Sequence, residues 1–368
     1  MTLSRNCFLL IASVVLVGLS LATALTAANP YTFLPGDCPY YAATTVSLVR
    51  DGDFEMRNQL EVSGQTLKDH DRFFAVSPTG GIVPKHSTLM PIVAVPAYVL
   101  FGIWGFLAFG LLQMLALVYG ISRLGGGTSS ARVDALVGLL LSPLLAYSYN
   151  FSPDVFGTAL VVWAFVCANE RRWSWCGVLC AAAVWAKVYL AVILLPLAWV
   201  VLAEGRSASV RVGVWAVLGL LPMLVLHSNL YGSPLRTGYD CEGQFTPSGE
   251  LVTSEHYSRF HQPVLEGLGN LLFDRDLGLV TKSAIWLGWP LGLWWAWRHP
   301  GRVRRVAGAM AASLVVNVLL FSRYDEWNAS VHGNRFLFPS LALSLALQGP
   351  FWHHVASSWR DQRPATGP

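Results

Sequence analysis

Long apolar stretches recur along the whole chain, separated by polar connections of unequal length. A helix needs about 20 apolar residues to cross the hydrocarbon core of a bilayer, so each stretch predicts one crossing. We expect about ten crossings in all. Their predicted ranges are 8–28, 89–121, 133–149, 154–169, 173–186, 188–203, 210–230, 277–297, 303–321 and 336–351. The pattern therefore predicts an all-α polytopic membrane protein.

The fifth and sixth predicted crossings are short, and one long tilted helix is an alternative to two separate ones. Arg171 and Arg172 precede the pair, while Arg206 and Arg211 follow it. Because the positive-inside rule places Arg-rich segments in the cytoplasm, both ends of the pair belong on that side. A hairpin that turns near Lys187 satisfies this rule.

The distribution of charge gives the predicted orientation. With the amino terminus inside, the Arg-rich connections fall on the cytoplasmic side. All but four of the 21 acidic residues then lie on the outer face. The outer loops are expected at about 29–88, 231–276 and 322–335. We expect a multi-pass protein of the plasma (inner) membrane with both termini in the cytoplasm and its working face outside.

Residues 1–368 are expected to form a single integral membrane domain, since no internal repeat or low-complexity linker divides them. The tail that begins at Phe351 is too short for a soluble C-terminal domain. Residues 1–28 have a second interpretation, because an early Arg, an apolar run and small residues are also typical of a secretory signal peptide. The apolar run is long for a signal peptide, which favours a retained helix.

The composition supports a membrane protein and argues against a nucleic-acid partner. Hydrophobic residues make up 54% of the chain and charged residues 12%, whereas soluble domains contain about 45–50% apolar residues. The net charge is only +4. The basic residues are scattered between apolar stretches, without a basic helix or the spacing of a zinc site, so we expect no nucleic acid.

Two of the six cysteines differ from the others, which lie in apolar stretches. Cys38 and Cys241 fall in polar loops on the predicted outer face. An oxidising compartment would allow a disulfide between them. Two unpaired thiols are the alternative, because the sequence does not supply the required geometry.

Two carboxylates are candidates for chemistry at the outer membrane surface. Asp37 directly follows the first crossing and precedes Pro39, and Asp154 follows Pro153 in the short turn before the fourth crossing. A carboxylate near hydrocarbon is costly, which is typical of a functional site. Each also has a simpler interpretation as a helix N-cap. As functional groups they would serve as a general base or as ligands of a divalent metal.

Cations on the same face would be needed to bind a substrate that carries phosphate. The candidates are Lys85, His86, Lys187 and Arg335. Lys187 interrupts an apolar stretch, so its side chain must either snorkel to the surface or pair with an anion. Arg335 has a guanidinium suited to clamp phosphate, and its simpler interpretation is a salt bridge to Asp325 or Glu326.

Two further side chains are candidates for substrate contact. Tyr40 belongs to a short helix expected to lie on the membrane surface, and His332 belongs to the polar, aromatic loop that ends at Arg335. The acidic stretch around Gly52 is instead expected to be a solvated turn.

Six stretches of the chain resemble, in order, motifs of the bacterial branch of the GT-C glycosyltransferase superfamily. They are residues 36–40 (GDCPY), 47–53 (SLVRDGD), 231–234 (YGSP), 237–239 (TGY), 272–279 (LFDRDLGL) and 333–339 (GNRFLFP). This branch includes relatives of the protein mannosyltransferases and of lipid A aminoarabinose transferase. The resemblance covers nearly the whole chain. It implies a GT-C-like helix bundle with a long first extracytoplasmic loop.

The resemblance also implies a substrate class and roles for particular residues. The donor would be a sugar on a polyprenyl phosphate or related lipid, and a glycan, lipid or protein acceptor would approach from the outer face. Asp37 matches the catalytic acid of the family's first loop, and cations near Lys85, Lys187 and Arg335 would hold the lipid phosphate. The chain departs from many relatives at Cys38, where they have a second acid, and in lacking the further helices or soluble C-terminal domain that many of them carry.

The predicted function is thus a hexosyl- or pentosyl-type glycosyltransferase that uses a lipid-phosphate sugar. Nucleotide sugars are confined to the cytoplasm, so transfer at the outer face requires a donor delivered through the membrane. A transporter or flippase for a lipid-linked saccharide and a non-catalytic membrane subunit are the alternatives. A flippase would be expected to show repeats or broken helices at matching positions, which the sequence does not show. The residues predict no definite cofactor and leave a divalent metal open.

Overall fold

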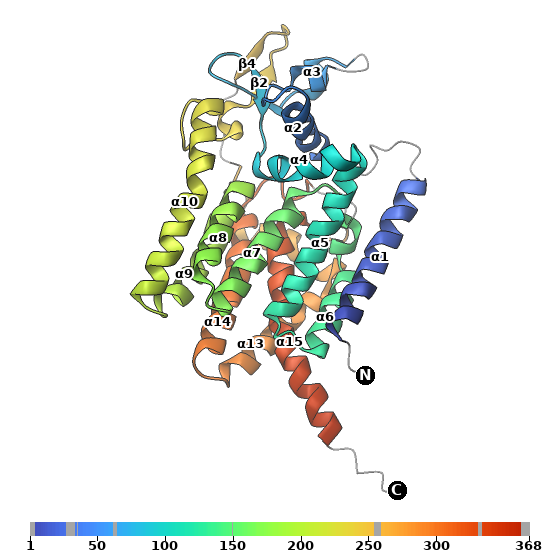
Figure 1. The fold of residues 1–368 in the computed structure, drawn as a ribbon, viewed down its shortest axis with the longest axis vertical. Helices are drawn as coiled ribbons and strands as arrows, with labels where there is room; N and C mark the ends of the chain where they lie inside the picture. The colour runs from blue at the N-terminus through green and yellow to red at the C-terminus, as the bar shows by residue number, and fades with distance from the viewer. Residues whose placement is uncertain are drawn as a thin grey trace.

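The structure, a computed structural model, describes residues 4–26, 34, 36–61, 65–148, 150–253, 259–329 and 333–361. Helices dominate these residues, and most of them stand side by side along the long axis of the molecule (Figure 1). A smaller cap of short helices and two hairpins covers one end of this bundle (Figure 1). The all-α polytopic architecture predicted from the apolar pattern is confirmed.

The bundle consists of ten helices within the described ranges. They are α1 (Arg5–Thr26), α5 (Trp104–Leu124), α6 (Ser129–Leu140), α7 (Pro153–Asn169), α8 (Trp173–Ala186), α9 (Leu190–Leu202), α10 (Arg206–Tyr231), α13 (Trp289–Trp297), α14 (Arg302–Phe321) and α15 (Phe338–Asp361). By length and apolar composition, α5, α10 and α14 could each cross a bilayer. The outermost of these is α10, whose Val217 and Val225 are exposed, as expected for a surface that lipid covers.

The cap is built from segments that were predicted as outer loops. The first of them contains α2 (Cys38–Arg50), α3 (Arg57–Leu60), the 3-10 helix η2 (Leu67–His70) and a hairpin of β1 (Phe74–Val76) and β2 (Ile82–Pro84). The second contains η4 (Gly238–Cys241), a hairpin of β3 (Gly243–Phe245) and β4 (Leu251–Thr253), and α11 (Val264–Phe273). A single antiparallel bridge between Ala75 and Glu242 connects the two hairpins.

Two predicted crossings are wrong as single helices. The range 89–121 is divided into α4 (Leu89–Phe101) and α5, because Gly102 has a φ of 58°, a conformation that residues with a Cβ rarely adopt. In Figure 1, α4 lies across the top of the bundle while α5 descends through it. The range 277–297 is divided into α12 (Leu279–Lys282), η5 (Ala284–Gly288) and α13. Pro290 lies in the first turn of α13 and has no N–H with which to continue the preceding turn.

The other predicted boundaries agree more closely with the structure. The hairpin near Lys187 is confirmed, since α8 ends at Ala186 and α9 begins at Leu190. The third predicted crossing, 133–149, corresponds to α6 followed by the 3-10 helix η3 (Pro143–Tyr147). The last helix continues to Asp361, beyond its predicted end at residue 351.

The amino-terminal helix is a packed part of the bundle. Phe8 and Leu16 of α1 are fully buried in the main hydrophobic core, and α1 contacts α5 and α6. This packing favours a bundle helix over the signal-peptide interpretation. The start of α1 and the end of α15 both lie at the end of the molecule opposite the cap (Figure 1), as expected for two termini on one side of a membrane.

A buried amide connects α14 to the segment that begins α15. Asn317 has no exposed surface, and its side chain donates to the carbonyl of Phe336 at 3.1 Å. The same side chain accepts from the backbone N–H of Ser340 at 3.3 Å and from the Ser340 hydroxyl at 2.8 Å. These three bonds fix the 3-10 helix η6 (Arg335–Leu337), which precedes α15.

We predict that Asn317→Ala destabilises the protein by about 1–3 kcal/mol, because the buried carbonyl of Phe336 and the backbone N–H of Ser340 would each lose this partner. Asn58 is a matched control, since its side chain is exposed and its bond within the described residues is to Asp51, at 3.1 Å. Asn58→Ala should change stability by no more than about 0.5 kcal/mol. Unfolding in mixed micelles would measure both variants, and equal losses would contradict the role given to Asn317.

Candidate functional site

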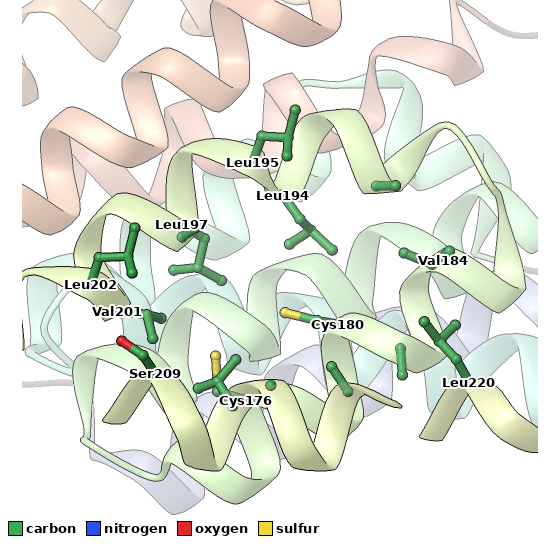
Figure 2. A pocket seen from close by; sticks show the side chains of 16 residues that line it. Cys176, Cys180, Val184, Leu194, Leu195, Leu197, Val201, Leu202, Ser209 and Leu220 are labelled. Atoms are coloured by element: carbon green, nitrogen blue, oxygen red, sulfur yellow. The ribbon is translucent and has the colours of Figure 1, made fainter. Parts of the chain in front are cut away.

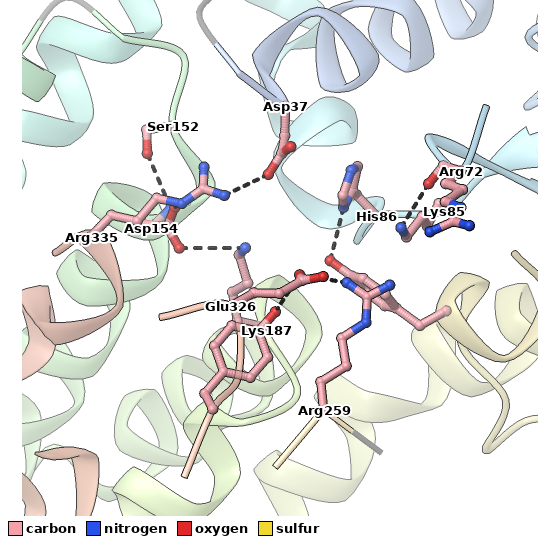
Figure 3. Close-up of polar contacts among 12 residues, drawn as sticks. Asp37, Arg72, Lys85, His86, Ser152, Asp154, Lys187, Arg259, Glu326 and Arg335 are labelled. Carbon is pink, nitrogen blue, oxygen red and sulfur yellow. Dashed lines mark hydrogen bonds and ion pairs between the residues drawn. The ribbon is translucent and has the colours of Figure 1, made fainter. Parts of the chain in front are cut away.

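Four charged side chains from distant segments meet where the cap joins the bundle. Asp37 precedes α2, Asp154 lies in the first turn of α7, Lys187 follows α8, and Arg335 begins η6. Figure 3 shows Arg335 between the two carboxylates and Lys187 beside Asp154. The structure thus brings together four of the residues predicted from the sequence, and we call them the charged cluster.

Asp37 is not the helix cap that its sequence position suggests. It occupies the N-cap position of α2, but its side chain makes no capping hydrogen bond. Its Oδ2 instead accepts a hydrogen bond from Nη2 of Arg335 at 2.9 Å. The Asp37 side chain remains 20% exposed, so the carboxylate has an accessible surface beside the cations.

The environment of Asp37 keeps its carboxylate ionised. Burial alone would raise the pKa of Asp37, but His86, Arg335 and Lys187 lower it to about 2. Burial also lowers the pKa of His86, to about 3, so that imidazole is neutral at pH 7. Arg335 and Lys187 are therefore the charges that hold Asp37 in its anionic form near neutral pH.

Asp154 is buried more deeply than Asp37. Its side chain has 0% exposed surface, with Oδ1 at 3.4 Å from Nζ of Lys187 and Oδ2 at 3.7 Å from Nε of Arg335. It does not cap α7, because the hydroxyl of Ser152 accepts the backbone N–H of Asp154 at 3.3 Å. The sequence could not decide between Ser152 and Asp154, since both residue types are common caps.

Lys187 pairs with an anion, which decides between its two predicted interpretations. It is the C-cap residue of α8, and its side chain is largely buried against Asp154. The end of α8 is fixed nearby, since the Ser87 hydroxyl donates to the carbonyl of Trp185 and the Trp185 indole donates to Thr88 at 3.1 Å. The first outer loop therefore positions the end of the helix from which Lys187 projects.

Arg335 does not form the salt bridge proposed as its simpler interpretation. Asp325 instead pairs with His261 at 2.9 Å, and Glu326 pairs with Arg259 at 2.5 Å. Arg335 is consequently directed at Asp37 and Asp154. Because η6 is held by Asn317, the guanidinium lies on a well-anchored segment.

His86 lies beside the charged cluster with one ring nitrogen bonded. Its Nδ1 is 2.9 Å from the hydroxyl of Tyr239, and its ring stacks on Tyr41. No hydrogen bond from the described residues reaches Nε2 of His86. Tyr239 approaches this closely because Gly238 has no side chain, since a Cβ there would lie 2.4 Å from the carbonyl oxygen of Lys85. Sequence reasoning assigned Tyr239 no role, although the TGY motif contains it.

Lys85 is placed in a different set of contacts from the one predicted. Its Nζ lies 2.6 Å from Glu242 and donates to the carbonyl of Arg72 at 2.7 Å. Glu242 also faces Arg259 at 3.5 Å, and Arg259 binds Glu326. This chain of charges, which is buried at Lys85 and Glu242, ties three outer loops together. No motif in the sequence indicated that Glu242 and Arg259 would join it.

Of the two residues predicted to contact substrate, the structure describes Tyr40, which contacts other residues than the charged cluster. The ring of Tyr40 stacks on Phe73 with centroids 4.6 Å apart, and its hydroxyl is 3.2 Å from Nδ1 of His70. His332 lies outside the described residues.

Cys38 and Cys241 are buried free thiols in separate apolar clusters, in line with the unpaired alternative.

The donor set does not fit a divalent metal. Among the residues that the structure describes, no three His, Cys, Asp or Glu side chains are grouped as metal ligands would be. The carboxylates of Asp37 and Asp154 are directed at Arg335 and Lys187, which already supply the positive charge that a metal would bring.

An apolar groove of about 360 Å³ lies between α8, α9 and α10 (Figure 2). Its wall is formed by aliphatic side chains and by Cys176, Cys180 and Ser209. Val184 and Ala191 belong to this wall, one helical turn from Lys187 on either side. The groove therefore runs along the two helices that meet at the charged cluster.

Comparisons with known proteins support the fold. No protein-family model and no curated protein sequence matches the chain. Two crystal structures of ArnT from Cupriavidus metallidurans are similar, one bound to undecaprenyl phosphate (TM-score 0.58) and one in the apo state (TM-score 0.55). Both are 16% identical to this chain in sequence. The alignment covers 95% of this chain for the first structure and 94% for the second. This chain spans 61% of the length of either structure. This likeness supports the fold alone, and it confirms that the chain forms a helix bundle like that of these two structures.

We predict that Lys85→Met destabilises the protein by about 3 kcal/mol, because Glu242 would lose its closest partner in a buried site. The exposed pair of Lys282 and Asp276, with 3.9 Å between its charged atoms, provides the control. Lys282→Met should cost at most about 1 kcal/mol. Denaturant titration in micelles measures both variants. A loss for Lys85→Met no larger than that of the control would show that its ion pair does not hold the loops together.

Proposed function

We propose that the protein is a membrane glycosyltransferase that moves a sugar from a polyprenyl-phosphate donor to an acceptor hydroxyl at the extracytoplasmic face. In this proposal residues 1–368 form one membrane domain of the plasma (inner) membrane, with both termini in the cytoplasm and the cap outside. The observation that carries the proposal is the charged cluster, in which a partly exposed carboxylate, Asp37, pairs with Arg335 while Lys187 pairs with the neighbouring Asp154. The hexosyl or pentosyl type of sugar follows from the sequence resemblance.

The donor phosphate would bind to Lys187 and Arg335. Guanidinium and ammonium groups form charge-assisted hydrogen bonds with phosphate oxygens, and both cations lie at the end of the bundle next to the cap. The apolar groove between α8, α9 and α10 begins next to Lys187 and would accept part of the prenyl tail. One of the two similar ArnT structures is bound to undecaprenyl phosphate, which supports a lipid of this class.

Asp37 would be the general base. Its carboxylate removes the proton of the acceptor hydroxyl while the acceptor oxygen forms a bond to the anomeric carbon. The bond between that carbon and the phosphate oxygen breaks, and its electron pair stays on the lipid phosphate, where Arg335 and Lys187 stabilise the charge. A single displacement inverts the anomeric centre.

The donor phosphate would also make Asp37 a better base. A carboxylate with a pKa of about 2 is a weak proton acceptor at neutral pH. A phosphate that shares Arg335 and Lys187 is a nearby like charge, and it raises the pKa of Asp37. His86 is neutral at pH 7, so it would contribute a hydrogen bond to the substrate rather than a charge.

We predict that Asp37→Asn lowers the rate of transfer at least about 100-fold, because the amide cannot accept the acceptor proton. The control is Asp51→Asn at the other end of α2, where Asp51 is exposed and bonds only Asn58 and Gln59 among the described side chains. Transfer from labelled polyprenyl-phosphate sugars by purified protein is the measurement.

Thermal unfolding of both Asp variants is measured beside transfer, and turnover is compared per folded molecule, which separates loss of the base from loss of the fold. Near wild-type turnover by Asp37→Asn would reject the assignment. The same assay distinguishes the proposal from its alternatives, since a flippase would move the lipid-linked sugar without cleaving it and a non-catalytic subunit would do neither.

We predict that the pH profile of kcat/KM depends on Arg335. Asp37 must be ionised to accept a proton, and its pKa of about 2 places the resulting acid limb below about pH 4 in the wild type. Arg335→Gln removes a cation that lowers the pKa of Asp37, while burial still raises that pKa. The acid limb of the profile should therefore move to a higher pH, by about one pH unit or more. Arg323→Gln, at an exposed loop residue, is the control, and a limb that does not move in Arg335→Gln would contradict the assignment.

A further inference from the structure

Asp154 has an environment that the proposed transfer step does not explain. Its side chain is completely buried, and neither carboxylate oxygen has a hydrogen bond from the described residues. Its contacts with Lys187 and Arg335, at 3.4 Å and 3.7 Å, are longer than the roughly 2.7–2.9 Å of charge-assisted hydrogen bonds. Asp154 therefore attracts both cations without forming a close bond to either. An acceptor hydroxyl cannot reach it, so it is not a second base.

The charges of the cluster balance without a substrate. Asp37 and Asp154 carry two negative charges, Lys187 and Arg335 carry two positive charges, and the neighbouring His86 is neutral at pH 7. A polyprenyl-phosphate sugar is a phosphodiester and adds one negative charge. Any phosphate that binds must therefore share Lys187 and Arg335 with the two carboxylates.

The reaction moves negative charge from Asp37 to the lipid phosphate. Asp37 becomes neutral when it takes the acceptor proton, and the departing phosphate becomes a monoester with a charge of about −1.5 to −2 near neutral pH. Arg335 touches Asp37 and would touch the phosphate, so it contacts both groups between which the charge moves. The product thus attracts the cations more strongly than the donor does, and product release becomes the difficult step.

We propose that Asp154 is a buried counter-ion that limits the affinity of Lys187 and Arg335 for phosphate, so that the polyprenyl phosphate product can leave. This role rests on the proposed function. When Asp37 takes the acceptor proton, Asp154 is the carboxylate of the cluster that still faces both cations and competes with the product for them. Because Asp154 touches no reacting atom, it is a positioning residue.

The test is the affinity of the wild type and of Asp154→Asn for undecaprenyl phosphate in lipid nanodiscs, measured by calorimetry. Removal of one opposing charge from a buried site should tighten binding by about tenfold or more. The constant for product inhibition by undecaprenyl phosphate should fall by the same factor, with a lower kcat and a lower KM for the donor. A purely structural role would weaken binding instead.

Asp154→Asn leaves two buried cations beside one carboxylate, and this imbalance could prevent folding. A second pair of variants tests the proposal in that case. Lys187→Gln and the double variant Asp154→Asn/Lys187→Gln differ again only at residue 154, and the double variant retains one carboxylate and one cation in the cluster. The double variant should bind undecaprenyl phosphate about tenfold more tightly than Lys187→Gln does. Inorganic phosphate is the second probe, and it should bind far more weakly because it lacks the prenyl tail.

The outcomes separate the two proposals. Equal or weaker binding after removal of Asp154, in both the single and the Lys187→Gln backgrounds, would overturn the counter-ion role and leave the transferase proposal intact. Failure of the wild type to bind undecaprenyl phosphate, together with absence of transfer, would overturn both. Inorganic phosphate that binds as tightly as the lipid would also overturn the counter-ion role, since the site would not be built to release a lipid product.

Discussion

The ion pair between Asp37 and Arg335 is the contact on which the site depends. It joins residues 298 positions apart and closes the cap onto the bundle where α15 begins. Neither group would tolerate its largely buried position alone, because removing one partner of a buried pair leaves an uncompensated charge. Asp154 and Lys187 extend the pair into a neutral group of four, and the arrangement of α2, α7, α8 and η6 is what brings these four side chains together.

The membrane fold gives this group its chemical setting. Apolar helices surround the charges on one side, and the cap covers them on the other, so water is largely excluded and electrostatic interactions are stronger than at an open surface. The cations are held by segments with fixed geometry, since Asn317 anchors the segment of Arg335 and the first outer loop anchors the end of α8. Such preorganised charge is what stabilisation of a departing phosphate requires.

Sequence patterns predicted the parts of the structure that depend on local composition. The apolar stretches and the Arg residues that flank them were sufficient for the α8–α9 hairpin and for the position of Lys187 at its tip. The acids and cations next to predicted helix ends included the four members of the charged cluster, although they also included Lys85, which pairs with Glu242 instead. The break at Gly102 was missed, because an apolar run does not reveal a left-handed residue within it.

The remaining contacts depend on packing between distant segments. Whether Asp37 or Asp154 caps its helix was not decided by the sequence, since the answer lies in the position of Arg335 for Asp37 and in the hydroxyl of Ser152 for Asp154. The pairing of Lys85 with Glu242 was not predicted, because it requires that two outer loops meet edge to edge. The close approach of Tyr239 to His86 depends on the lack of a side chain at Gly238. This explains the glycine of the TGY motif, but only the packing of the two loops reveals it.

If the charged cluster binds the phosphate of a lipid carrier, that phosphate must lie against Lys187 and Arg335. Phosphorus NMR of undecaprenyl phosphate in nanodiscs detects such a contact at the phosphate itself, with the wild type compared with Lys187→Gln/Arg335→Gln. We expect a shifted and broadened phosphorus signal with the wild type and an unperturbed signal with the double variant. The same spectrum with both proteins would contradict a phosphate site at the charged cluster.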